Sequence, residues 1–167
     1  YHLVSMREAG FDGDVEENGD TFADNAVLKA EAVRDATGYA ALADDSGLMV
    51  DALGGAPGVH SARFAGVHGD DAANNALLMD KLKDVPAPRT AQFVSAIALA
   101  SPFLPTRLFE GVCPGVVTFA PRGQQGFGYD PYFEYDTGKT FAEMSDEEKA
   151  QVSHRARAMH KLLAALA

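Results

Sequence analysis

The segment from Ala43 to Leu48 reads Ala-Asp-Asp-Ser-Gly-Leu and places two adjacent carboxylates directly behind a short apolar run, residues 40–43. Such a run is typical of a buried strand, and Gly47 permits a sharp turn whose backbone approaches a ligand closely. Carboxylates at the end of a strand in an α/β protein face the crevice where ligands bind. The segment therefore predicts a turn that presents Asp44 and Asp45 to a ligand, although an ordinary solvent-exposed turn has the same composition.

The chain has 167 residues, which is enough for one domain with a hydrophobic core. Its longest apolar stretch, residues 93–100, is too short to span a bilayer, and its first residues lack the pattern of a secretion signal. We therefore expect a single domain, residues 1–167, in the cytoplasm and without membrane contact. The single cysteine, Cys113, excludes an intrachain disulfide.

The charge balance restricts the class of partner. A net charge of −10 argues against binding to long DNA or RNA, because general nucleic-acid binders carry basic faces. A small polyanion remains compatible with this charge if divalent cations and a local basic cluster offset the acidic background.

Caps and apolar periodicity indicate three helical regions. The first runs from about Phe22 to Ala36, with Thr21 as its cap and Gly38 as its stop. The second runs from Asp71 to about Lys83, with acidic residues at its start and a proline shortly after its end. Both helices carry apolar residues at helical spacing, so we expect each to pack one face on a core.

The third helical region opens with a capping box, residues 145–148, and continues to the end of the chain. Lys149, His154 and Arg155 would point in three different directions on one unbroken helix. Because Ser153 is a good cap residue, we expect a short helix that ends just before it and a new helix from His154. The first turn of the new helix would then be an anion site.

Strands are predicted at residues 91–100 and 107–113, as an antiparallel pair joined by a turn that contains proline. Residues 48–50 and 116–119 are shorter candidates. Residues 122–131 form a loop dense in glycine and aromatic residues, whose backbone can approach a planar ligand.

Five motifs follow one another along the chain: Thr21–Ala26 with Lys29 and Ala30, Ala43–Leu48, Leu53–Gly58 with Ser61–Arg63, Phe127–Pro131, and Ser153–Arg155. In this order and spacing they resemble the inosine/xanthosine triphosphate pyrophosphatase family over nearly the whole chain. The resemblance implies an α/β fold with a long mixed, twisted sheet flanked by helices, two lobes around a central cleft, and a homodimer.

The implied activity is hydrolysis of the deaminated purine nucleotides ITP, dITP and XTP to the monophosphate and pyrophosphate with Mg²⁺, which cleanses the nucleotide pool. Two alternatives stay open: a related house-cleaning pyrophosphatase for other modified nucleotides, or a nucleotide-binding module without turnover. Family members begin with a strand and a phosphate loop of the Ser/Thr-x-Asn-x-x-Lys type, whereas residues 1–5 resemble the family's second strand. We therefore expect that roughly two dozen residues precede this sequence in the whole protein.

The resemblance also assigns the metal site and the catalytic base. Asp45 is implied as a metal ligand and as the general base that activates water. Glu17 is implied as the second metal ligand, with Glu16 as the alternative. Asp44 is either a partner of Asp45 or a solvated turn residue. Lys29 is implied to face the triphosphate.

The implied substrate contacts are Ser46, Phe127, Gly128, Tyr129, Asp130, Lys149, His154 and Arg155. Ser46 donates to phosphate or sugar, Phe127 stacks on the purine, and Asp130 orders the loop or accepts a hydrogen bond from the substrate. Arg155, with His154 beside it, donates to the O6 atom of the base. A fixed donor at this position selects oxo-purines, because adenine carries an amino donor where they carry an acceptor.

Overall fold

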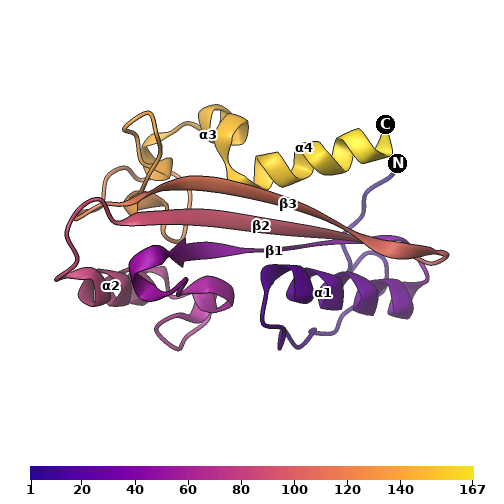
Figure 1. Cartoon of the computed structure of the whole chain (residues 1–167). Helices are drawn as coiled ribbons and strands as arrows, with labels where there is room; N and C mark the ends of the chain where they lie inside the picture. Colours follow the sequence, from indigo (N-terminus) through magenta and orange to yellow (C-terminus); the bar gives the residue numbers. More distant parts are fainter.

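The computed structural model describes all 167 residues and is built on a four-stranded sheet in the order β1-β2-β3-β4 (Figure 1). The strands are β1 (Ala41–Val50), β2 (Thr90–Ser101), β3 (Leu104–Val117) and β4 (Phe133–Glu134). Every pair is antiparallel. The α/β class with a long sheet flanked by helices is thus confirmed, but the sheet is antiparallel, not mixed as expected.

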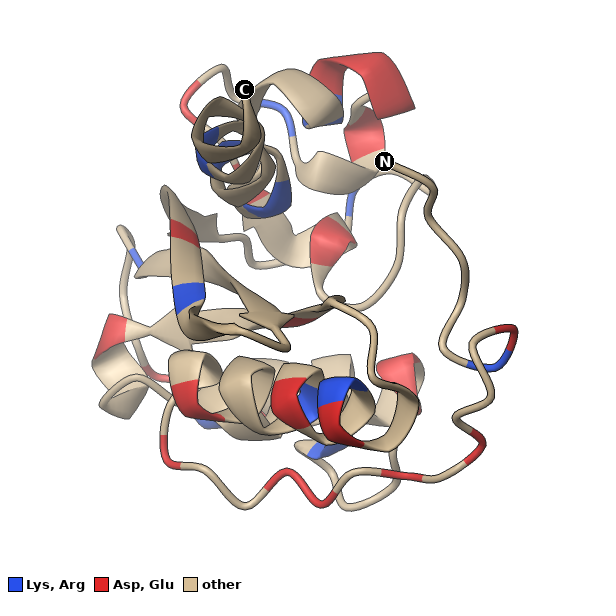
Figure 2. Ribbon diagram, turned by 90° about the vertical axis from the view of Figure 1, so that its right-hand side faces the viewer, with Lys and Arg blue, Asp and Glu red and all other residues tan.

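Helices cover both faces of the sheet. Helix α1 (Phe22–Thr37) packs below the strands, and α4 (His154–Leu166) packs above them (Figures 1 and 2). Helices α2 (Asp71–Leu82) and α3 (Asp146–Val152) lie at the other end of the molecule, on opposite sides of the sheet (Figure 1). None of the helices has the length and apolar character needed to cross a membrane.

The helix predictions are confirmed because their signals are local. The Thr21 side chain accepts a hydrogen bond from the Asp24 amide at the start of α1, and Gly38 ends this helix in the left-handed region with φ 76°. Helix α2 ends at Leu82, one residue before the expected end. Ser153 ends α3 and caps α4, accepting from the amide of Ala156. The predicted break between these two helices is therefore present.

The prediction of a turn at residues 44–47 is wrong. Strand β1 runs straight through this segment, and all 10 of its residues pair with β2. The cause is not local, because the long apolar β2 strand supplies pairing partners that outweigh the turn composition of Asp-Asp-Ser-Gly. Gly47 serves close packing instead of a turn: a Cβ there would overlap Ser61 and Gly58 of the short 3₁₀ helix η2 (Gly58–Arg63).

Both shorter strand predictions turn out to be the ends of longer strands, and the one at residues 48–50 is the end of β1. The strand expected at residues 116–119 is the end of β3, which stops at Val117. Residues 1–5, which resemble a strand of the related family, form no strand and make no pairing with the sheet. The predicted antiparallel pair is confirmed, and both of its strands are longer than expected.

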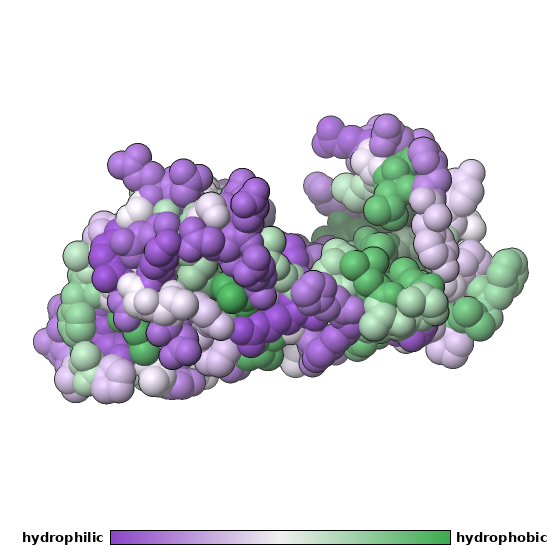
Figure 3. Space-filling model, turned by 90° about the horizontal axis from the view of Figure 1, so that it is seen from above, coloured by the Kyte–Doolittle hydropathy of each residue, from purple (hydrophilic) through white to green (hydrophobic).

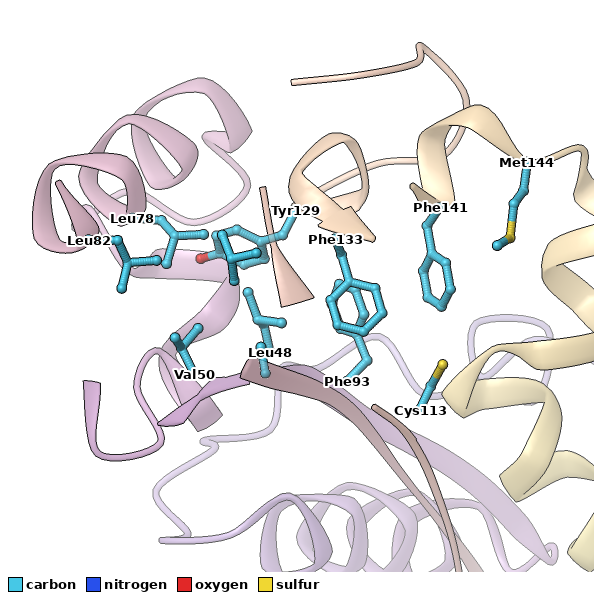
Figure 4. Close-up of a cluster of buried hydrophobic side chains, with 12 residues drawn as sticks. Leu48, Val50, Leu78, Leu82, Phe93, Cys113, Tyr129, Phe133, Phe141 and Met144 are labelled. Carbon is cyan, nitrogen blue, oxygen red and sulfur yellow. The ribbon is translucent and has the colours of Figure 1, made fainter. Parts of the chain in front are cut away.

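The largest core cluster lies between α2, the sheet and the segment before α3 (Figure 4). Phe93 of β2 stands at its centre: its ring lies 4.6 Å from that of Phe133 and 5.5 Å from that of Phe141, centroid to centroid. Smaller clusters hold α1 and α4 on the two faces of the sheet. Seen from above, the surface is hollowed between two masses, in keeping with the expected two-lobed shape (Figure 3).

Candidate active site

Asp44 and Asp45 point to opposite faces of the sheet, because successive side chains of a strand alternate. Asp45 faces α1 and contacts Lys29. Asp44 faces the side of α4 and contacts Arg155. The two acids predicted to act at one turn therefore belong to two different environments.

Asp45 lies in a compact charged cluster with Lys29 and Glu17. The Lys29 Nζ atom is 2.9 Å from Glu17 Oε1 and 3.3 Å from Asp45 Oδ1. It also donates to the backbone carbonyl of Asp44 at 2.7 Å. Asp45 Oδ2 is buried and has no hydrogen-bond partner. The structure thus brings Glu17 and Asp45 together around Lys29, whereas Glu16 is exposed and forms no ion pair with Lys29.

The charges of this cluster shift the acidities of its members. Burial raises the pKa of Asp45 to about 6, an effect to which Glu17 adds and which Lys29 opposes. Burial acts on Glu17 in the same direction, but its hydrogen bond and charge contact with Lys29 keep its pKa below the usual value. Asp45 is therefore a carboxylate whose proton affinity approaches that of a base acting near neutral pH.

A cavity of about 250 Å³ lies on the other side of β1. Its lining residues are Ser46, Gly47, Ser61, Ala62, Gly69, Asp71, Asn74, Phe93, Phe127, Gly128, Tyr129, Asp130, Lys149, His154 and Arg155. All eight residues expected to contact substrate line this one cavity, although they come from β1, the loop before β4, α3 and α4. Asp45 does not line it.

The loop at residues 127–130 closes one wall of the cavity. Phe127 is 64% exposed, and the ammonium group of Lys149 lies 5.0 Å from the centre of its ring. Lys149 also pairs with the buried Asp130 at 2.6 Å, and Asp130 accepts from the amide of Phe127 at 3.1 Å. The amide of Gly128 donates to Asp71 at 2.9 Å. Asp130 thus holds the loop through these two contacts, while the ring of Phe127 stays exposed.

Tyr129 is more deeply embedded than its neighbours in this loop. Its ring belongs to the main core cluster, and its hydroxyl donates to the carbonyl of Ser61 at 2.6 Å. Burial raises its pKa, so the hydroxyl stays protonated. Tyr129 can therefore offer the cavity its ring but not a free hydroxyl.

His154 forms part of the floor of the cavity. Its ring stacks on Phe93 with the centroids 4.8 Å apart, and its Nδ1 atom is buried without a hydrogen-bond partner. Burial, together with the positive charge of Arg155, lowers the pKa of His154 to about 3. The imidazole is thus neutral near physiological pH, with one nitrogen as donor and the other as acceptor.

The depressed pKa of His154 predicts a pH dependence of stability. Between pH 6.5 and 3 the unfolded state binds a proton at this residue and the folded state does not, so stability falls as the pH is lowered through this range, by up to about 1.4 kcal/mol per pH unit. Between pH 7 and 5, chemical denaturation of a His154→Gln variant is expected to show a smaller loss of unfolding free energy than the parent. Equal losses would show that His154 is not buried in its neutral form.

Arg155 reaches across the cavity to Asp44. Its Nε and Nη2 atoms donate to Asp44 Oδ2 at 3.2 and 2.9 Å. The Asp44 carboxylate also accepts from the hydroxyl groups of Ser46 and Ser95, at 2.8 and 2.6 Å. Burial opposes the charged form of Asp44, but these contacts keep its pKa below the usual value. Asp44 is therefore an ionised, fully engaged carboxylate and not a solvated turn residue.

The outer edge of β1 joins the cavity to the Asp45 cluster. Strand β1 is at the edge of the sheet, and the amide of Leu48 and the carbonyl of Asp44 both bond away from β2, to Ser61 and Lys29. Since every second residue of an antiparallel strand directs its amide and carbonyl to the same side, the amide of Ser46 lies on this edge as well. The backbone amide of Ser46, a residue that lines the cavity, thus faces the same edge of β1 as the carbonyl that accepts from Lys29.

Sequence reasoning did not single out Ser95 or Asp71. Ser95 was detectable as the lone polar residue in the centre of the apolar segment 93–100. Asp71 stands where acids are common at a helix start, so its bond to the loop at Gly128 had no distinct signal. Ser95 and Asp71 each form a hydrogen bond with a residue far away in the sequence, Asp44 and Gly128 respectively.

A family model and the sequences of individual relatives match this chain and agree with one another. The model of the Ham1 family matches residues 1–165. A dITP/XTP pyrophosphatase of Geobacillus kaustophilus is 56% identical over 151 residues, which are 89% of this chain and 74% of the relative. A dITP/XTP pyrophosphatase of Bacillus subtilis is 47% identical over 164 residues, which are 97% of this chain and 83% of the relative.

Solved structures agree with this match. The Ham1 protein of Staphylococcus aureus superposes with a TM-score of 0.95 at 44% identity, covering 99% of this chain and 86% of that one. A nucleoside-triphosphatase / dITP/XTP pyrophosphatase of Mycobacterium abscessus gives a TM-score of 0.84 at 49% identity, with coverage of 99% and 86%.

Proposed function

The chain belongs to the Ham1 family, and we propose from this that it hydrolyses dITP, ITP and XTP to the nucleoside monophosphate and pyrophosphate. Relatives that are 47–56% identical carry the name dITP/XTP pyrophosphatase. The observation that supports the proposal most directly is the arrangement around β1: a base-sized cavity on one side of the strand and a carboxylate cluster on the other, joined at Ser46.

The cavity suits an oxo-purine. Phe127 offers an exposed ring for stacking, and the neutral His154 and the guanidinium of Arg155 offer N–H donors to the O6 acceptor. Adenine would set its amino donor against these donors. The site is therefore proposed to prefer deaminated purines to adenine nucleotides.

The polyphosphate is proposed to follow the outer edge of β1 from the cavity to Asp45. The Ser46 amide and the Lys29 ammonium group lie along this route as donors. Asp45 takes the proton from the attacking water. Lys29 meanwhile offsets the charges of Asp45 and Glu17.

The residues of this cluster fit Mg²⁺. The buried Oδ2 atom of Asp45 lacks a partner, and Glu17 adds a second carboxylate beside it. No three His, Cys, Asp or Glu side chains are close enough to hold a metal ion by themselves. Mg²⁺ suits this donor set, since it is commonly bound by one or two carboxylates together with water and substrate phosphates. When bound, the ion would neutralise phosphate charge and acidify the attacking water.

Pyrophosphate release tests the proposal. With Mg²⁺, the protein is expected to release pyrophosphate from dITP and XTP at least about tenfold faster than from dATP, the factor that one lost hydrogen bond gives. EDTA is expected to abolish turnover, and excess Mg²⁺ to restore it. Preference for a modified pyrimidine or methylated purine nucleotide would favour the related house-cleaning enzyme. Tight binding of dITP without pyrophosphate release would favour a binding module.

We further propose that the chain forms a homodimer, as the family resemblance implies. On β3, the side chains of Leu104, Leu108 and Val112 are exposed by 65%, 44% and 40%, which supports burial against another surface. Light scattering after size exclusion is expected to give twice the chain mass of 17.7 kDa. A particle of the single mass would contradict the proposal. The cytoplasmic location expected from the sequence stays a prediction.

A further inference from the structure

We propose that Asp44 is a positioning residue that holds the guanidinium of Arg155 in the cavity with its Nη1 group free to face the purine. The inference rests on the proposed function, because it concerns how the same site distinguishes one base from another. It gives the two adjacent acids of β1 separate tasks: Asp45 acts at the phosphates, and Asp44 acts through Arg155.

The contacts between the two side chains leave one donor group unused. Arg155 Nε and Nη2 both donate to Asp44 Oδ2, and Nη2 also lies 3.4 Å from the hydroxyl oxygen of Ser46. Arg155 Nη1 makes no hydrogen bond within the protein. Because the guanidinium is planar, fixing Nε and Nη2 also fixes the direction of the Nη1 donors.

The carboxylate of Asp44 is itself held in place. Ser95, which is fully buried on β2, donates to Asp44 Oδ1 at 2.6 Å, and Ser46 donates to the same oxygen at 2.8 Å. These bonds fix the orientation of the carboxylate plane. The direction of Arg155 is thus determined by side chains of β1 and β2.

Arg155 needs such an anchor because of its position. It lies in the first turn of α4, where the helix dipole disfavours a positive charge. Its side chain is 45% exposed, and its one carboxylate partner within 4.0 Å is Asp44. Without Asp44 the side chain would gain rotamer freedom and turn toward solvent. A donor that is no longer aimed loses most of its hydrogen-bond strength and with it the distinction between O6 and an amino group.

The test is an Asp44→Asn variant assayed with dITP and dATP, with Asp51→Asn as the matched control at the exposed position that directly follows β1. We expect the ratio of kcat/KM for dITP to that for dATP to fall about tenfold in Asp44→Asn, as for one lost charged hydrogen bond. The loss should appear in KM, with kcat within about threefold of the parent. Asp51→Asn should keep the ratio. Ser95→Ala should lower the ratio of kcat/KM for dITP to that for dATP by a smaller factor. This variant replaces Asp44→Asn as the test if Asp44→Asn does not fold.

A double-mutant cycle shows whether Asp44 acts through Arg155. The Asp44→Asn, Arg155→Ala double variant is expected to be no more than about twofold worse on dITP than Arg155→Ala alone. Losses that multiply, an unchanged substrate ratio, or a collapse of kcat in Asp44→Asn would each overturn the proposal.

A measurement without turnover separates this inference from the proposed function. The NMR signal of the Arg155 Nε–H group is expected to be protected from solvent exchange in the parent and to lose that protection in Asp44→Asn. If the parent releases no pyrophosphate from dITP or XTP, the proposed function fails while this signal still tests the anchoring. Equal protection in both proteins would overturn the role of Asp44 whatever the activity.

Discussion

Replacement of Asp45 by asparagine is expected to lower kcat for dITP by at least about a thousandfold. Asparagine preserves the shape of the side chain but cannot accept the proton of water. It also removes the charge next to Glu17 on which cation binding would depend. Pyrophosphate release under saturating dITP and Mg²⁺ measures this loss.

The same variant is expected to stay folded, with a melting temperature equal to or above that of the parent. Burial raises the pKa of Asp45 to about 6, which means that the folded state disfavours its charge, and the neutral amide removes this cost. Lys29 keeps its ion pair with Glu17. Asp84→Asn, at an exposed position after α2, is the matched control and should keep full activity. Substantial activity in Asp45→Asn would remove this residue from the chemical step.

Arg155→Ala is expected to reduce kcat/KM for dITP by about 10–100-fold, the effect of losing charged hydrogen bonds to the base. The loss for dATP should be no more than a few fold, since adenine offers no O6 acceptor to this side chain. Parallel measurements of kcat/KM with the two nucleotides reveal the difference.

Arg34→Ala is the control for a lost surface arginine, because Arg34 lies on α1 and pairs with Asp35 and Glu31 outside the cavity. It should leave both substrates unchanged. Equal losses for dITP and dATP in Arg155→Ala would mean that this side chain binds a part common to both nucleotides, such as the phosphates, and does not read the base.

The helices could be predicted from the sequence because short-range chemistry determines them. Thr21, Gly38 and Ser153 bond to backbone groups only a few residues away, so their roles are legible in the sequence itself. Of these helix boundaries, the one at Ser153 between α3 and α4 has the largest effect on the geometry of the site. It lets Lys149 approach the cavity from α3 while His154 and Arg155 approach from α4.

The course of β1 could not be predicted from its own residues. Asp-Asp-Ser-Gly favours a turn, and only the pairing with β2, more than forty residues away, keeps it extended. Where these residues point follows from that pairing. The sequence motifs identified the residues around the cavity, but not that Asp44 and Asp45 lie on opposite faces.

The ion-pair and hydrogen-bond partners of the charged residues could not be predicted from the sequence either. The bridge from Lys29 to Glu17 and Asp45 joins a loop, a helix and a strand, and Ser95 meets Asp44 only across the sheet. The motif resemblance indicated that these acids matter, while the three-dimensional contacts indicate how each one is held.

The opposite orientations of Asp44 and Asp45 make the alignment of β1 against β2 a constraint on chemistry as well as on folding. If the strand slid by a single residue, Asp45 would move to the purine side and Asp44 to the phosphate side, or each would be replaced by a neighbour. Sheet hydrogen bonding would survive such a slip, and an acid would still face each side. A one-residue insertion or deletion between Ala41 and Asp44 is therefore expected to remove selectivity and catalysis together, and to destabilise the protein as well, because Leu48 and Val50 would turn out of the core.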